Sequence, residues 1–60
     1  MHVNLKPNLT DPDGFYQALL DAHDGLNPEE SAAFNARLIF VLANQIGDPE
    51  VLAKALEAAT

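Results

Sequence analysis

Apolar residues recur every three or four positions in three stretches of this sequence. This spacing places them on one face of an α-helix, in which successive residues are about 100° apart. The pattern therefore predicts an all-α protein. The first and last stretches each form a single apolar stripe, made of Phe15, Leu19, Ala22 and His23 in the one and of Leu52, Ala55, Leu56 and Ala59 in the other.

A repeated pattern marks the start of each predicted helix: a residue with a side-chain acceptor, a proline and then an acid, at residues 11–13, 27–29 and 48–50. The first residue can cap the helix, the proline suits the first helical position, and the acid faces the positive end of the helix dipole. Gly25 and Gly47 suit the left-handed position that ends a helix. We therefore predict helices over residues 12–24, 28–46 and 49–59.

The exact caps are less uniform than this pattern. At the first helix both Thr10 and Asp11 qualify as the N-cap, and Thr10 with Asp13 has the spacing of a capping box. Asn27 and Glu30 have the same spacing at the second helix. A reciprocal pair of side chain to backbone hydrogen bonds is therefore expected there.

The first ten residues differ from the rest, because their apolar positions alternate. A period of two is typical of extended chain, and Pro7 favours an extended backbone at Lys6. We predict an extended arm over residues 1–10 that lies across the helices or a neighbour, with a frayed terminus as the alternative. A single small three-helix domain around a long central helix then covers residues 11–60.

The central helix has apolar residues on two faces. A helix that is apolar nearly all round is usually buried, yet two shorter neighbours cannot cover both faces of it. The second face is therefore the candidate for contact with another chain. The first face comprises Ala32, Leu38, Ile39, Leu42, Ala43 and Ile46, and the second comprises Phe34, Phe40 and Val41 beside a polar line of Glu30, Arg37 and Asn44.

Size strengthens the expectation of a partner. A chain of 60 residues buries only about 60% of its unfolded surface, so small domains usually need an additional stabilising device. With no cysteine, the chain can form neither a disulfide nor a thiolate metal site. Oligomerisation or docking on a larger protein is the device that remains.

Charge narrows the choice of partner. Nine acids against three bases give a net charge of −6, which disfavours nucleic acid and anionic membrane surfaces. The longest uninterrupted apolar run, residues 38–43, is far shorter than the roughly 18 residues that a membrane helix requires. The first residues lack the basic and apolar regions of a signal peptide. We therefore expect a cytoplasmic protein.

Three polar residues of the central helix lie among apolar ones. The helical neighbours of Arg37 are all apolar, so its guanidinium needs a tertiary partner such as Asp21, Asp24 or an acid of another subunit. Arg37 either binds an anionic ligand or anchors a protein interface. The alternative is that it forms a structural ion pair or extends along the surface into solvent. Asn35 and Asn44 either fix the register of an interface, or bond a loop carbonyl, or are simply exposed.

The sequence gives little evidence for a catalytic site or a metal site. His23 with Asp21 and Asp24 is the alternative ligand site, but spacings of two and three do not bring all three side chains together. Two simpler explanations of His23 are its position in the last helical turn, where the dipole favours an imidazolium, and partial burial against Tyr16 and Leu19. Ser31 has no histidine within helical reach. We therefore expect no catalytic residue, no metal ligand and no cofactor, and a protein that is not an enzyme.

Four segments resemble a family of short uncharacterised proteobacterial proteins of about 60 residues, known as a domain of unknown function. They are residues 12–16, 23–26, 35–38 (Asn-Ala-Arg-Leu) and 42–48 (Leu-Ala-Asn-Gln-Ile-Gly-Asp). The resemblance covers nearly the whole chain and implies an accessory role beside larger enzymes, such as those of aromatic degradation. It supplies no catalytic residue. It draws attention to Asn35, Arg37, Asn44 and Asp48.

These observations predict a small interaction or accessory protein that self-associates or docks on a larger enzyme. The alternative is a small-ligand or metal-binding module that uses Arg37, or His23 with the acids of the first helix. The predicted interface consists of Phe34, Arg37, Phe40, Val41 and Asn44, in which the phenylalanines supply apolar area and the arginine a directional contact.

Overall fold

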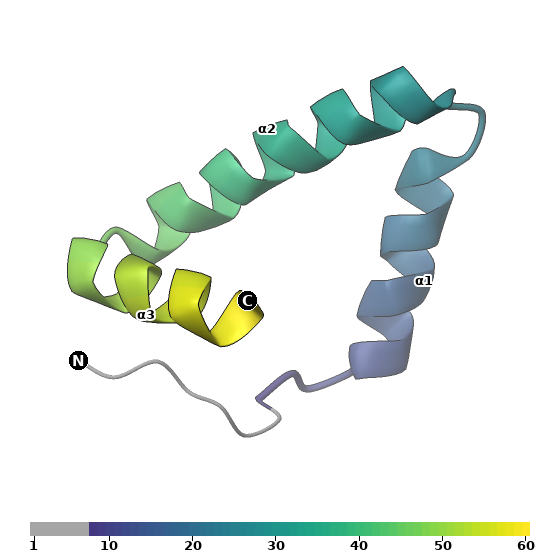
Figure 1. The fold of residues 1–60 in the computed structure, drawn as a ribbon. Coiled ribbons are helices and arrows are strands. Elements are labelled where there is room, and N and C mark those ends of the chain that lie inside the picture. The colour runs from purple at the N-terminus through teal and green to yellow at the C-terminus, as the bar shows by residue number, and fades with distance from the viewer. Residues whose placement is uncertain (1–7) are drawn as a thin grey trace.

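The computed structural model describes residues 8–60, and in this part of the chain it contains three helices and no strand. They are α1 (Pro12–His23), α2 (Pro28–Ile46) and α3 (Pro49–Ala59), shown in Figure 1. The all-α class is confirmed, and the predicted helix bounds agree except that α1 ends one residue earlier. The C-cap of α1 is Asp24, whose backbone is extended.

The three helix starts are capped by the first residue of the repeated pattern. Asp11 rather than Thr10 caps α1, because its Oδ1 accepts a hydrogen bond from the backbone N–H of Gly14 at 3.0 Å. A Cβ on Gly14 would collide with the Asp11 carboxylate, so this glycine makes room for the cap. The predicted capping box of Asn27 and Glu30 is present in both directions, at 2.8 and 3.0 Å.

Two glycines turn the chain between helices. Gly25 and Gly47 have φ angles of +81° and +76°, in the left-handed region that residues with a Cβ rarely adopt. The backbone N–H of Gly47 still bonds the carbonyl of Ala43 at 2.8 Å, so α2 is closed before the chain reverses. At the next residue the side chain of Asp48 accepts from the N–H of Glu50 and starts α3.

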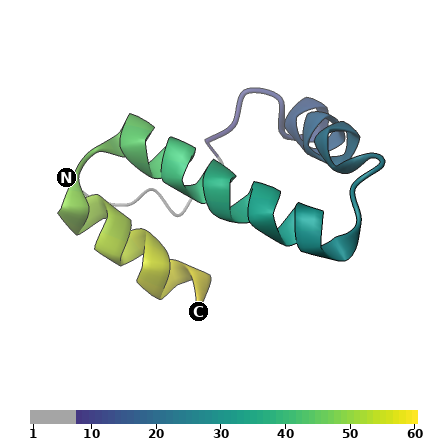
Figure 2. The ribbon, with the colours of Figure 1, turned by 90° about the horizontal axis from the view of Figure 1, so that it is seen from above.

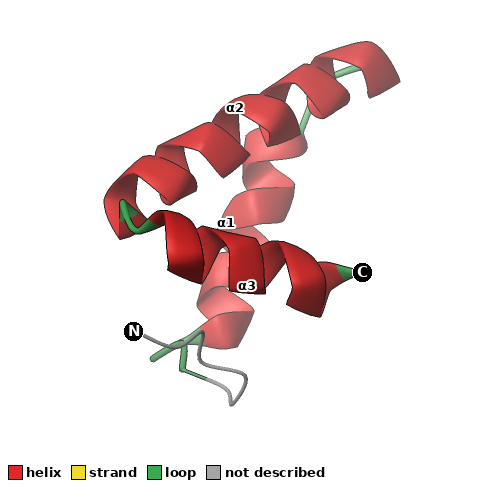
Figure 3. Ribbon diagram, turned by 60° about the vertical axis from the view of Figure 1, so that its left-hand side comes forward, coloured by secondary structure: helices red, strands yellow, loops and turns green. Residues whose placement is uncertain are grey.

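The helices form an open arrangement in which α1 and α3 leave opposite ends of α2 (Figures 1 and 2). Figure 3 shows α3 folding back beneath the C-terminal half of α2, while α1 lies behind. The radius of gyration is 13.2 Å, against about 10 Å expected for a compact domain of this length. The three helices therefore do not close into a compact bundle.

Burial follows from this shape. Val51, which is 8% exposed, is the one buried residue among residues 8–60, and neither α1 nor α2 contains a buried residue. The predicted packing of α1 and α3 around the central helix is thus only partly realised. α3 contacts the end of α2, and α1 meets α2 at the corner that joins them.

The predicted N-terminal arm falls largely outside the described residues. Within the described part, residues 8–11 are non-helical, and Leu9 is exposed. The proposal that the arm has an apolar edge lying across the helices therefore stays a prediction.

Candidate functional site

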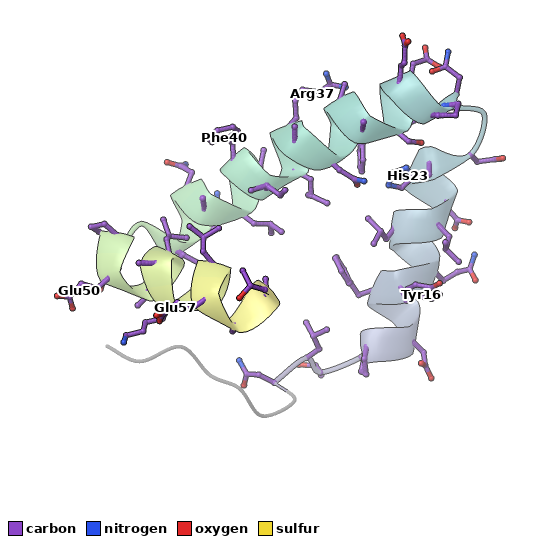
Figure 4. The ribbon with its side chains drawn as sticks, in the orientation of Figure 1. Tyr16, His23, Arg37, Phe40, Glu50 and Glu57 are labelled. Atoms are coloured by element: carbon purple, nitrogen blue, oxygen red, sulfur yellow. The ribbon has the colours of Figure 1, made fainter. Side chains whose placement is uncertain are left out.

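The second face of α2 remains open to solvent. Phe40 is 76% exposed and Val41 56% exposed, and Arg37 and Asn44 are exposed as well. Figure 4 shows the side chains of Arg37 and Phe40 pointing away from both α1 and α3. These four residues therefore form a continuous surface on the outer side of the molecule, which we call the outer face.

Phe34, the fifth predicted interface residue, lies elsewhere. Its ring packs edge-on against the ring of His23, with centroids 4.8 Å apart and an interplanar angle of 73°. Phe34 is half-buried as a result, whereas the outer-face residues are exposed. The structure thus assigns Phe34 to the corner between α1 and α2, although the sequence grouped it with Phe40.

Arg37 has no carboxylate within ion-pairing distance among residues 8–60, where the one ion pair joins Lys54 Nζ to Glu57 Oε2 at 3.9 Å. The expected partners Asp21 and Asp24 on α1 do not pair with it, since the corner between α1 and α2 keeps α1 on another side of α2. The guanidinium is exposed, so solvent satisfies it in the single chain. It remains available to a partner.

The sequence did not predict the polar cluster that lies at the corner between α1 and α2. The imidazole of His23 lies between two residues of α2, with Nδ1 2.9 Å from Ser31 Oγ and Nε2 3.1 Å from Asn35 Oδ1. In the tautomer that carries its proton on Nε2, the ring donates to the side-chain amide oxygen of Asn35, and Nδ1 accepts from the Ser31 hydroxyl. The sequence signal was the i, i+4 spacing of Ser31 and Asn35, which places both on the same side of α2.

The cluster of His23, Ser31 and Asn35 has the residue types of a nucleophile, a base and a group that orients the base. However, an apolar groove lies away from this cluster, at the other end of α2, between α2 and α3. Both ring nitrogens of His23 already have partners, which opposes metal binding by this residue. Within residues 8–60, no group of three or more His, Cys, Asp or Glu residues is arranged to hold a metal ion.

We expect the corner cluster to position α1. Replacing His23 with alanine removes two hydrogen bonds and the ring contact with Phe34, which should cost about 1–2 kcal/mol of local stability. Amide hydrogen exchange should then accelerate across α1 while α3 is unaffected. Gln17→Ala is the control, because it removes an exposed bond to Asp21 within α1 alone. Equal exchange in α1 of wild type and His23→Ala would contradict a positioning role.

A second open surface lies between α2 and α3. It is a groove with a volume of about 590 Å³, and its walls are the stripes that the sequence led us to expect on the inside. Ile39 is 63% exposed and Leu56 71% exposed, so α3 covers the first face of α2 only in part. The groove is lined by Ile39, Phe40, Leu42, Ala43 and Ile46 of α2 and by Leu52, Ala55, Leu56 and Ala59 of α3.

None of the helices within residues 8–60 combines the length and apolar character that crossing a membrane requires. Fold and surfaces together define a small all-α protein with apolar helix faces left open. The chain belongs to the family described as Protein of unknown function (DUF2783), whose family model matches residues 3–60. The resemblance to a domain of unknown function is thereby confirmed. No curated protein and no solved structure matches the chain.

Proposed function

We propose that this protein is a non-catalytic interaction or accessory protein, which buries apolar faces of α2 against another protein chain. The outer face of Arg37, Phe40, Val41 and Asn44 is the surface offered to that chain. A larger enzyme is the partner we favour for it, in keeping with the accessory role that the family resemblance implied.

One observation carries this proposal: the chain leaves the outer face of its longest helix open and covers the opposite face only in part. Among residues 8–60, a single side chain is buried, whereas ten large apolar residues are exposed. Monomeric proteins rarely leave contiguous apolar surface of this kind in water, and where they do it marks a site of association. Phe40, the most exposed of these ten residues, lies where the outer face meets the rim of the groove.

The composition of the outer face suits a protein partner better than a small ligand. Aromatic residues and arginine are enriched at the energetic centres of protein interfaces, where they combine apolar area with directed hydrogen bonds. Arg37 has no intrachain ion pair among residues 8–60 that a partner's carboxylate would have to displace. The alternative of a metal or ligand site at His23 has less support, because its ring nitrogens are occupied by Ser31 and Asn35.

The test is affinity capture from the source organism with the tagged chain at native expression level. We expect wild type to retain a larger protein in stoichiometric amount, and Val41→Glu to lose it at least tenfold, since a charge in a buried contact is costly. Arg37→Ala should weaken capture if the arginine meets a buried carboxylate.

Tyr16→Glu is the matched control, because Tyr16 is an exposed apolar side chain on α1, away from α2 (Figure 4). It should capture the same protein as wild type. Equal capture by wild type and Val41→Glu would show that the outer face is not the docking surface. A response of the melting temperature to a small ligand, with no protein captured, would favour the ligand-binding alternative instead.

A further inference from the structure

We propose that the groove between α2 and α3 is the surface at which two copies of this chain associate, helix pair against helix pair. This inference rests on the proposed function only in treating the chain as an interaction protein. It assigns the groove to a second copy and leaves the outer face for a different protein. The groove and the outer face have one residue in common, Phe40, which lies at the rim of the groove.

The first argument is area. The chain exposes 5291 Å². A folded monomer of its 6.5 kDa mass is expected to expose about 3,800 Å². The difference is about 1,500 Å² per chain, or about 3,000 Å² for two, which lies within the range of obligate homodimer interfaces. This excess belongs to the chain as a whole, α1 included, and it is of the scale that a permanent dimer buries.

The second argument is charge. A chain with a net charge of −6 repels its own copy over most of its surface, so self-association needs a region free of acids. Residues 38–47, which supply the α2 wall of the groove, contain no charged residue at all. The residues that line the α3 wall are apolar too. The groove is therefore a place where two copies can meet without bringing like charges together.

The third argument is shape. Each wall of the groove is a stripe with the spacing i, i+3, i+4, i+7: residues 39, 42, 43 and 46 on α2, and residues 52, 55, 56 and 59 on α3. An amphipathic helix pair with both stripes turned to one side is half of a four-helix core. A twofold axis brings the same stripes of a second copy onto these, so one self-complementary patch suffices.

Sedimentation of wild type and three variants tests this arrangement. Ile39→Glu and Leu56→Glu place a charge on each wall of the groove, and Val41→Glu places one on the outer face. All three positions are exposed in the single chain, at 63%, 71% and 56%, so none of the changes disrupts its own packing. Helical content measured by circular dichroism verifies that each variant is folded.

We expect wild type and Val41→Glu to sediment with about twice the chain mass of 6.5 kDa, and both groove variants with the mass of one chain. A wild-type monomer at all concentrations overturns the inference, whether residues 1–7 of the same chain or another protein then covers the groove. A dimer that only Val41→Glu dissociates also overturns it, yet leaves the proposed function of the outer face in place.

A second measurement does not depend on disruptive variants. Because the sequence has no cysteine, Ala59→Cys introduces a single thiol at the groove for a spin label. Labels on two copies should show a short mutual distance, whereas labels at Ala33→Cys, which is exposed and does not line the groove, should lie farther apart. A shorter distance between labels at residue 33 than at residue 59 would overturn the inference.

Discussion

Replacing Val51 with glutamate is expected to lower the melting temperature by about 10 °C or more, although the change improves the local start of α3. Val51 is the one buried side chain among residues 8–60, and it lies in the first turn of α3, where that helix meets the end of α2. Burying a valine contributes about 1.5–3 kcal/mol, and a charge in its position adds a desolvation cost. About 1 kcal/mol shifts the melting temperature of so small a domain by about 4–8 °C.

The local effect of this substitution has the opposite sign. Residue 51 is the third position of the helix that Asp48 caps, so a glutamate there completes the spacing of a capping box. It also places an acid near the positive end of the helix dipole. These gains amount to about 1 kcal/mol at most, less than the burial that is lost.

The comparison that isolates burial is Ala53→Glu, two residues along α3 at an exposed position. It adds the same charge to the same helix and should change the melting temperature by only a few degrees. Thermal unfolding followed by circular dichroism measures both variants. If Val51→Glu melts no lower than Ala53→Glu, the contact between α2 and α3 does not stabilise the fold.

The melting temperature of the wild-type chain is expected to rise with its concentration, by about 5 °C for each tenfold increase. A dimer that unfolds to two chains gains about 1.4 kcal/mol of apparent stability per tenfold increase in concentration. The shift is large because the single chain, with one buried residue in its described part, has little core of its own. In the dimer we propose, unfolding and association are therefore coupled.

Leu56→Glu supplies the control for this second experiment. Its side chain lines the groove, so the variant should melt at a lower temperature that does not change with concentration. Identical melting of wild type at every concentration would mean that the chain folds without a second copy. That result would contradict the dimer inferred from the groove. It would not bear on the docking of the outer face on a larger protein, which affinity capture tests.

The helix bounds were predictable because local chemistry sets them. Asn27 and Glu30 satisfy each other's free backbone groups within one turn, and Gly25 and Gly47 adopt a backbone that other residues avoid. Each of these devices acts over four residues or fewer. The sequence therefore contained all the information needed to place them.

The candidate site was predictable only in part. The exposure of Arg37, Phe40, Val41 and Asn44 agrees with an unpaired second face of the long helix. The spacing of the sequence grouped Phe34 with them, yet Phe34 packs against His23. The turn at Gly25 places the end of α1 beside that side of α2. The periodicity of a helix reports which residues share a face, but it does not report which neighbour covers that face.

By itself, the sequence determined three helices, their caps and turns, and the two apolar sides of the central helix. Only the tertiary structure decided that the stripes expected to be inside line an open groove, and that His23 reaches Ser31 and Asn35. The physical reason is the difference in range. Capping and backbone preference act between neighbours in the chain, whereas the angle between helices depends on how side chains from separate helices fit together.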